Sequence, residues 1–289
     1  MDIRPECVPC LLKRVLYQSK LADNGSEFDS LSAALEVFDK EFREGRNSAE
    51  VATLVHTGAY AAIGVRDPYL ELKVRADAVA ETLLNKAQDY VDSSEDRLRA
   101  AITVALSGNI MDFGQGTSIE HPDMFEEIFD ELLAQGIGSD DTDKLMNHLE
   151  RSGDIIYIFD NSGESQLDKI LIRELRRMGK RVVGVVRGEP ILNDVTMEDA
   201  LRTGLDKELD DLIDTQAFAI GVPVMIREDL SKAIPDSSLI IAKGMANFES
   251  LNKRDLGIPI AFLLRAKCEP VADSLDVDVG VNVVRVINE

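Results

Sequence analysis

Apolar residues recur at three- and four-residue spacings through the first hundred residues of the chain. Four segments carry this pattern, and they cover residues 10–22, 29–45, 48–64 and 69–91. An Asp-Pro-Tyr turn at residues 67–69 interrupts the pattern between the third segment and the fourth. Such spacing places the apolar side chains on one face of a helix. We therefore expect residues 5–105 to be helical.

The pattern changes after Glu150. Five short runs are almost continuously apolar and rich in β-branched residues, and they cover residues 154–160, 181–187, 237–243, 259–266 and 279–287. Strands that are buried on both faces of a parallel sheet have this composition. Helical patterns alternate with these runs, at residues 165–179, 197–205 and 247–257. The predicted fold class is α/β, with a doubly wound, mostly parallel sheet.

The two halves of the chain are not separated by a linker rich in proline, glycine and serine. The region between them, residues 107–150, is transitional and contains the glycine-rich stretch SGNIMDFGQGTS. We therefore expect two units in contact. An all-helical N-terminal subdomain, residues 1–105, is expected to pack on an α/β domain, residues 106–289.

The composition is typical of a globular protein, and its charge disfavours some classes of binding partner. The 289 residues are 45% hydrophobic and 29% charged, and the formal net charge is −21. This excess of acid disfavours nucleic acid and anionic membrane surfaces as partners, because both require a basic face. No apolar run reaches the length of a membrane span, and the first residues lack the apolar stretch of a signal peptide. We expect a cytoplasmic protein in which an anionic substrate would need a metal or a well-placed lysine.

Four clusters of polar residues lie at or near the ends of the predicted strands. Ligands of open α/β sheets bind beyond the carboxyl ends of the strands, so these clusters are expected at one edge of the sheet. Taken singly, each has an ordinary structural explanation, such as a helix cap, a turn or a solvated charge. Together they predict a functional site. The clusters are residues 108–112 (GNIMD), 160–164 (DNSGE), 187–196 (RGEPILNDVT) and 243–249 (KGMANFE).

The chemistry of these clusters favours a metal and a phosphate group. Asp160, Asn161 and Asp194 offer the hard oxygen ligands that suit Mg²⁺ or Mn²⁺. The backbone amides of residues 162 and 163, at a predicted helix start, are suited to a phosphate oxygen. Lys243 would neutralise the same group. A metal, a helix N-terminus and a lysine are the parts that phosphoryl transfer uses.

The other residues with catalytic or metal-binding chemistry give weaker signals. The three histidines, His56, His121 and His148, fall outside the four clusters, which disfavours a histidine nucleophile or a histidine-ligated zinc. Cys7 and Cys10 form a CxxC pair, and the remaining cysteine is Cys268. These thiols are either buried structural residues or, if the two ends of the chain meet, a three-thiolate metal or redox site.

The order of these motifs resembles a known family. An N-terminal CxxC, then SGNxxDxG, DNSGE after an apolar strand, RGxPxxNDxT and KGxxNxE are similar to the damage-control phosphatases, in particular to their archaeal stand-alone branch. The resemblance covers nearly the whole chain. It implies an all-α N-terminal part, an α/β metal-binding part, and divalent-metal-dependent hydrolysis of small phosphorylated metabolites with Mn²⁺, Mg²⁺, Co²⁺ or Ni²⁺.

The resemblance also implies roles for individual residues. Asp160, Asn161 and Asp194 match the metal ligands, and Asp160, Lys243 and Glu164 are the candidate catalytic residues. The candidate residues for binding phosphate or substrate are Asn109, Asp112, Ser162, Gly163, Asn247 and Glu249.

Three other functions compete with this interpretation. A haloacid-dehalogenase-like phosphatase needs a second aspartate two residues after the first, but position 162 is Ser. An S-adenosylmethionine-dependent carboxyl methyltransferase would be expected to carry a glycine-rich GxGxG after the first strand, which the sequence lacks. A metal- or nucleotide-binding regulatory module stays open. The sequence does not specify the natural substrate, the native metal or the oligomeric state.

Overall fold

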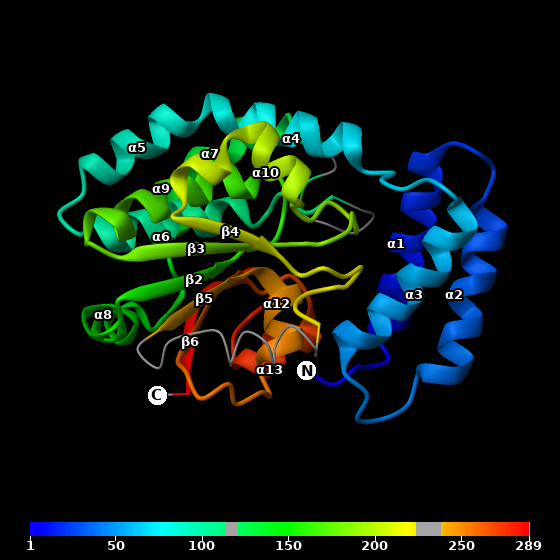
Figure 1. The fold of residues 1–289 in the computed structure, drawn as a ribbon. Helices are drawn as coiled ribbons and strands as arrows, with labels where there is room; N and C mark the ends of the chain where they lie inside the picture. The colour runs from blue at the N-terminus through cyan, green and yellow to red at the C-terminus, as the bar shows by residue number, and fades with distance from the viewer. Residues whose placement is uncertain (114–118, 120, 224–237, 289) are drawn as a thin grey trace.

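The computed structural model describes residues 1–113, 119, 121–223 and 238–288. Helices dominate the first half, and strands and helices alternate in the second (Figure 1). The helices are α1 (Cys7–Ala22), α2 (Glu27–Glu41), α3 (Ser48–Ile63), α4 (Leu70–Thr82), α5 (Leu84–Asp92), α6 (Arg97–Gly108), α7 (Met124–Gln135), α8 (Thr142–Arg151), α9 (Glu164–Arg177), α10 (Met197–Thr203), the 3-10 helix η1 (Leu205–Glu208), α12 (Gly244–Leu251) and α13 (Glu269–Leu275).

The strands form one sheet, in the order β1-β7-β6-β5-β2-β3-β4. All neighbouring pairs are parallel except β6 and β7. The predicted α/β class with a mostly parallel sheet is therefore confirmed. The strands are β1 (Ser139–Asp140), β2 (Asp154–Ile158), β3 (Arg181–Val186), β4 (Asp211–Asp214), β5 (Leu239–Lys243), β6 (Ile260–Arg265) and β7 (Asn282–Ile287).

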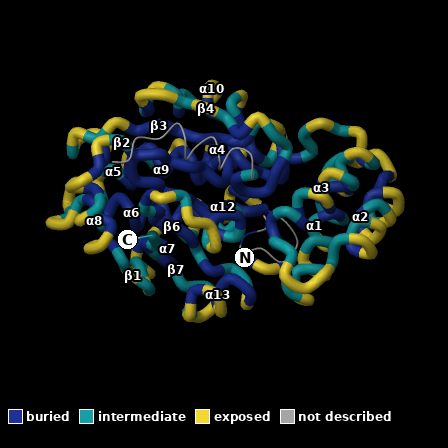
Figure 2. The backbone as a smooth tube through the Cα atoms, turned by 60° about the horizontal axis from the view of Figure 1, so that its bottom comes forward, coloured by how far each residue is buried: buried dark blue, intermediate teal, exposed yellow. Residues whose placement is uncertain are grey.

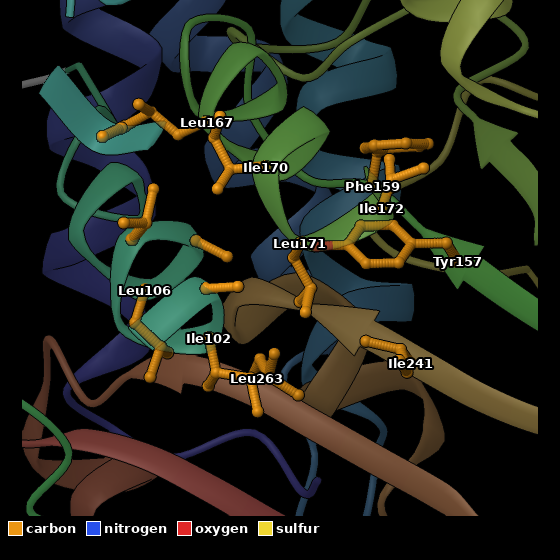
Figure 3. Close-up of a cluster of buried hydrophobic side chains, with 14 of the residues drawn as sticks. Ile102, Leu106, Tyr157, Phe159, Leu167, Ile170, Leu171, Ile172, Ile241 and Leu263 are labelled. Atoms are coloured by element: carbon orange, nitrogen blue, oxygen red, sulfur yellow. The ribbon is translucent and has the colours of Figure 1, made fainter. Parts of the chain in front are cut away.

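The two faces of the sheet are covered by different helices. In β2, Ile155 and Tyr157 face one hydrophobic cluster, and Ile156 and Ile158 face the other, as the two-residue period of a strand requires. The first cluster is filled from α6 and α9, whose side chains meet Tyr157, Ile241 and Leu263 in Figure 3. The second cluster contains residues of α12 and α13. Burial on both faces explains why the central strands are continuously apolar.

The N-terminal helices divide into two groups. Helices α1, α2 and α3 pack on one another as a separate bundle, at the right of Figure 1. Helices α4, α5 and α6 instead pack against α9, in the layer above the sheet. The helix expected at residues 69–91 is two helices, α4 and α5, that meet at Leu83. The subdomain boundary that we expected after residue 105 falls within α6, which is continuous.

The bundle rests on the carboxyl edge of the sheet through specific contacts of α3. The Tyr60 hydroxyl accepts from the Leu192 amide at 2.9 Å, and the Thr53 hydroxyl accepts from the Ile220 amide at 2.9 Å. Asn47, which caps α3, donates to the Glu249 carbonyl in α12 at 3.1 Å. Figure 2 shows the buried sheet and α9 in dark blue, with exposed segments on the outer side of α2. The space between the bundle and the sheet edge is where a cavity forms.

Among the described residues, no helix is long and apolar enough to cross a membrane.

Candidate active site

A cavity of about 370 Å³ lies between the α1–α3 bundle and the carboxyl edge of the sheet. Its wall combines residues from both ends of the chain and from the loops that follow β2, β3 and β6. The charged or polar lining residues are Glu6, Arg14, Ser48, His56, Asp112, Asp160, Asn161, Asp194, Glu249, Lys267 and Glu269, and three cysteines, Cys7, Cys10 and Cys268, line it as well.

The three predicted metal ligands meet in this cavity. Asp160 and Asn161 follow β2, Asp194 lies in the loop after β3, and an antiparallel bridge joins Asn161 to Asp194. The Val195 amide donates to the Asp160 carbonyl at 2.9 Å, which fixes the two loops against each other. All three side chains are almost completely buried. The sequence therefore brings two carboxylates and an amide to one point, as expected for neighbouring parallel strands.

Gly244, the first residue of α12, makes room for the Asp160 carboxylate. Its φ is +73°, and a β-carbon there would collide with the carboxylate of Asp160. Only glycine satisfies both conditions. The glycine directly after β5 is therefore required by the position of Asp160.

Asp160 and Asp194 are acidic side chains in a poorly solvated environment. Burial, together with the neighbouring carboxylates of Asp194 and Glu164, raises the pKa of Asp160 well above its usual value. Burial also raises the pKa of Asp194, against the opposing charge of Arg187. The fully buried Arg187 guanidinium donates to Asp194 Oδ2 at 2.6 Å and lies 3.6 Å from Asp160 Oδ1. One arginine is thus shared by two acids.

The donor set fits a divalent cation. Two carboxylates and an amide are hard oxygen ligands, and the positive charge of a cation would offset their mutual repulsion. The NH₂ group of Asn161 already donates to Asp160 at 2.8 Å and to Glu164 at 2.9 Å, so its oxygen is the atom left for a cation. The cation would be held by Asp160, Asn161 and Asp194.

Lys243 does not line the cavity. Its ammonium is fully buried (0% exposed) and lies 2.6 Å from both Glu164 Oε1 and Asp168 Oδ1. Burial alone would lower the pKa of Lys243, but the two carboxylates raise it above its usual value. The expectation that this ammonium emerges beside the metal to meet a phosphate is therefore wrong, because two acids of α9 already neutralise it. Its contribution to catalysis stays a prediction.

Glu164 connects Lys243 to Asp160. Burial opposes its ionisation, but the adjacent ammonium of Lys243 holds the pKa of Glu164 below its usual value. Asn109 donates to both oxygens of Glu164 at 3.0 Å and to Asp160 at 3.4 Å. The Asn109 oxygen accepts from the Arg265 amide at 2.9 Å, so its polar atoms are used inside the protein.

The amides expected to bind phosphate are also engaged. The Ser162 amide donates to the Asn193 carbonyl at 2.8 Å, and the Gly163 amide donates to Asp77 Oδ1 at 2.6 Å. In this arrangement neither amide is free for a ligand, which corrects the expectation of a phosphate site at the start of α9. The sequence does not reveal this, because Asp77 comes from a distant helix, α4.

Of the two candidate residues on α12, Glu249 lines the cavity and Asn247 does not. Asn247 donates to the carbonyls of Phe159 and Lys243 and accepts from Arg187 at 3.1 Å, so it holds Arg187 in position. It does not line the cavity. Glu249 does line it, and burial raises the pKa of Glu249 despite a hydrogen bond from Ser48.

Two cations that the sequence analysis did not select face the cavity. Arg14 of α1 donates to both oxygens of Asp112 at 2.9 Å, and Lys267 lies 3.1 Å from Asp112 Oδ2. Burial opposes ionisation of Asp112, but these two cations depress its pKa. Lys267 follows β6, the strand next to β5, so the reasoning applied to the other strand ends would have found it. Arg14 carries no comparable signal.

All three cysteines line the cavity, although they come from opposite ends of the chain. They are free thiols, and burial raises the pKa of Cys268 to about 12. Within the described ranges, no group of three or more histidine, cysteine, aspartate or glutamate residues is arranged to hold a metal ion. The three-thiolate metal site is therefore not supported, and the thiols stand as part of the cavity wall.

Fold and site together define an α/β protein whose sheet edge carries two carboxylates and an amide, Asp160, Asp194 and Asn161, in one cavity with the bases Arg14 and Lys267. Comparison with known proteins is consistent with this class. The model of the damage-control phosphatase ARMT1-like domain matches residues 3–283, and the chain belongs to this family. The family is one of metal-dependent phosphatases, and the chain is a phosphatase.

Similar proteins come from archaea. The chain is 37% identical to a damage-control phosphatase of Archaeoglobus fulgidus, over 99% of this chain and 100% of the relative. It is 31% identical to a damage-control phosphatase of Pyrococcus horikoshii, over 97% and 96% of the two chains. The crystal structure of a DUF89-family protein of P. horikoshii superposes with a TM-score of 0.83 at 30% identity, over 98% of each chain.

Proposed function

We propose that this phosphatase hydrolyses small phosphorylated metabolites in the cavity, with a divalent cation held by Asp160, Asn161 and Asp194. The observation that carries the proposal is that these three side chains share a cavity with two bases, Arg14 and Lys267. When bound, the cation supplies positive charge to the phosphoryl oxygens. Mn²⁺, Mg²⁺, Co²⁺ and Ni²⁺ are the candidates.

The bases supply the remaining positive charge. Arg14 and Lys267 are held by Asp112, and their ion pairs lie at the cavity wall, with side chains only 15% and 10% exposed. A phosphate group can share these two donors with Asp112, because each base has further N–H groups. Charge on the phosphoryl oxygens persists into the transition state, so this contact assists the reaction as well as binding.

The surrounding residues keep the ligands in place. Arg187 fixes one oxygen of Asp194 and lies beside one oxygen of Asp160, while Asn247 orients Arg187. Lys243 holds Glu164, which accepts from Asn161. We therefore assign Arg187, Asn247, Lys243 and Glu164 to positioning the ligand side chains, and the direct catalytic roles expected for Glu164 and Lys243 from the sequence stay predictions.

The test is phosphate release from a panel of small phosphate esters with each of the four metals in turn. We expect turnover by the wild-type protein and a loss of about 100-fold or more in Asp160→Asn. Glu127→Gln, an exposed acid of α7, is the matched control and should keep full turnover. Wild-type turnover in Asp160→Asn would overturn the site. A protein that binds the metal and releases no phosphate would instead favour a regulatory module.

A further inference from the structure

One residue of the cavity wall has an unused polar atom. His56, on α3, is fully buried (0% exposed) and lines the cavity that also holds Asp160 and Asp194. Its Nδ1 lies 3.0 Å from Oε1 of Gln18, which is buried in α1. An amide oxygen only accepts hydrogen bonds, so with the Gln18 amide in this orientation Nδ1 carries the proton. The other ring nitrogen, Nε2, therefore presents a lone pair.

This lone pair has no protein partner in the part of the chain that the structure describes. A buried acceptor without a partner is costly, so such an atom in a cavity wall points to a ligand. Burial and the nearby charge of Arg14 lower the pKa of His56 to about 3. The ring stays neutral near pH 7, so it accepts a hydrogen bond and cannot supply a positive charge.

The surroundings of His56 restrict the group that it can accept from. The same wall contains apolar side chains, including Leu11, Ala52, Leu192 and Ile220. The positive charge of Arg14 acts on His56 and would repel a cationic donor. A neutral hydroxyl or N–H group next to an apolar segment suits this environment.

We propose that His56 Nε2 is the acceptor subsite for a neutral hydroxyl or N–H donor on the leaving portion of the phosphate ester. This proposal rests on the proposed phosphatase function. Gln18 is a positioning residue, because its oxygen fixes the tautomer that leaves Nε2 free. The subsite would favour esters that carry such a donor over otherwise identical esters that lack it.

The experiment compares ω-hydroxyalkyl phosphates of increasing length with the alkyl phosphates of the same length. The readout is the kcat/KM for the hydroxylated ester divided by the kcat/KM for the alkyl phosphate of the same length. We expect the ratio to peak at one length in the wild type and to fall about ten-fold in His56→Phe, which removes the acceptor and keeps a ring. A ratio unchanged by His56→Phe would overturn the subsite, even if both rates fall together.

The control and a second measurement make the result independent of the folding of one variant. His148→Phe, on α8 and outside the cavity, should leave the ratio as in the wild type. Nitrogen-15 spectra of the wild type, which has three histidines, should show one neutral ring protonated at Nδ1 whose Nε2 signal moves with the hydroxylated ester and not with the alkyl ester. A ring protonated at Nε2 would overturn the proposal. Absence of phosphate release from every ester with every metal would overturn the phosphatase assignment and the subsite together.

Discussion

At the residue scale, several positions are fixed by a neighbour that the local sequence does not contain. Gly244 is required by the carboxylate of Asp160, 84 positions away, and Arg187 is placed by both Asp194 and Asn247. Each of these residues has a close packing or hydrogen-bonding partner in the site. Substitutions at this scale therefore report on contacts within the site.

Substituting Gly244 separates backbone strain from disruption of the site. We expect Gly244→Ala to cost about 1–2 kcal/mol of stability from its positive φ and, in addition, to displace Asp160 and lower turnover by about 100-fold or more. Gly257→Ala is the matched control, because Gly257 has φ +70° with nothing within 4 Å of a β-carbon. Urea denaturation and steady-state kinetics of both variants measure the two effects. Equal turnover in the two variants would contradict the role of Gly244.

His56 makes the stability of the protein depend on pH. Its pKa is about 3 in the folded protein and about 6.5 in the unfolded chain, so the unfolded state binds the proton more tightly. The free energy of unfolding therefore falls as the pH drops below about 6.5, by roughly 1.4 kcal/mol per pH unit from this residue.

Urea denaturation of the wild type and His56→Phe at a series of pH values tests this dependence. We expect the free energy of unfolding of the wild type, relative to that of His56→Phe, to fall by roughly 2 kcal/mol between pH 6.5 and pH 5. The variant has no group at this position that the unfolded state could protonate. A difference in free energy of unfolding that is constant over this range would show that His56 takes up a proton as readily in the folded state as in the unfolded chain.

At the element scale, two neighbouring strands each lead to a lysine, and the structure gives the two lysines different environments. Lys243 at the end of β5 is enclosed between Glu164 and Asp168 of α9. Lys267, just after β6, faces the cavity beside Asp112 and Arg14. The pair provides a comparison between a buried ion pair and a ligand-facing base.

Substituting Lys243 should damage the fold and the site together. Lys243→Met leaves two buried carboxylates without their cation, and breaking such a pair costs about 3–5 kcal/mol. We expect a much lower urea midpoint, together with reduced turnover because Glu164 loses its position. A midpoint like that of the wild type would show that the two acids take up protons at little cost.

Substituting Lys267 should affect substrate and leave the fold largely intact. In Lys267→Met, Arg14 still neutralises Asp112, so we expect a smaller loss of stability than in Lys243→Met, where the acids lose their only cation partner among the described residues. KM for a phosphate ester should rise about ten-fold, since one charge-assisted contact is lost. The same two assays, on the same ester and metal, check this. An unchanged KM would remove Lys267 from the phosphate site.

Much of the element scale followed from the sequence. The apolar runs at residues 154–160, 181–187 and 259–266 are the buried strands β2, β3 and β6, because burial on both faces requires uninterrupted apolar residues. The edge strands were missed. β4 is the polar sequence DLID and β1 has only two residues, so neither has a buried face that the pattern could reveal.

At the scale of the whole molecule, the site is made where the helical bundle meets the sheet. The proximity of Asp160, Asn161 and Asp194 was predictable, because strands of one parallel sheet bring their carboxyl ends together. The contributions of Arg14 and His56 were not, because they depend on how α1 and α3 pack on that edge and no local pattern encodes it. The ion pairs of Lys243 and the hydrogen bonds of the Ser162 and Gly163 amides could not be predicted for the same reason, because their partners come from other elements.

The central claim is that Asp160, Asn161 and Asp194 hold one divalent cation in a cavity that also binds phosphate. Anomalous diffraction from crystals grown with Mn²⁺ and inorganic phosphate tests it most directly. We expect one strong peak in contact with oxygens of these three side chains, with phosphate between that peak and the side chains of Arg14 and Lys267. A peak at the three thiols or at Glu164 and Asp168, or a phosphate remote from the peak, would contradict the claim.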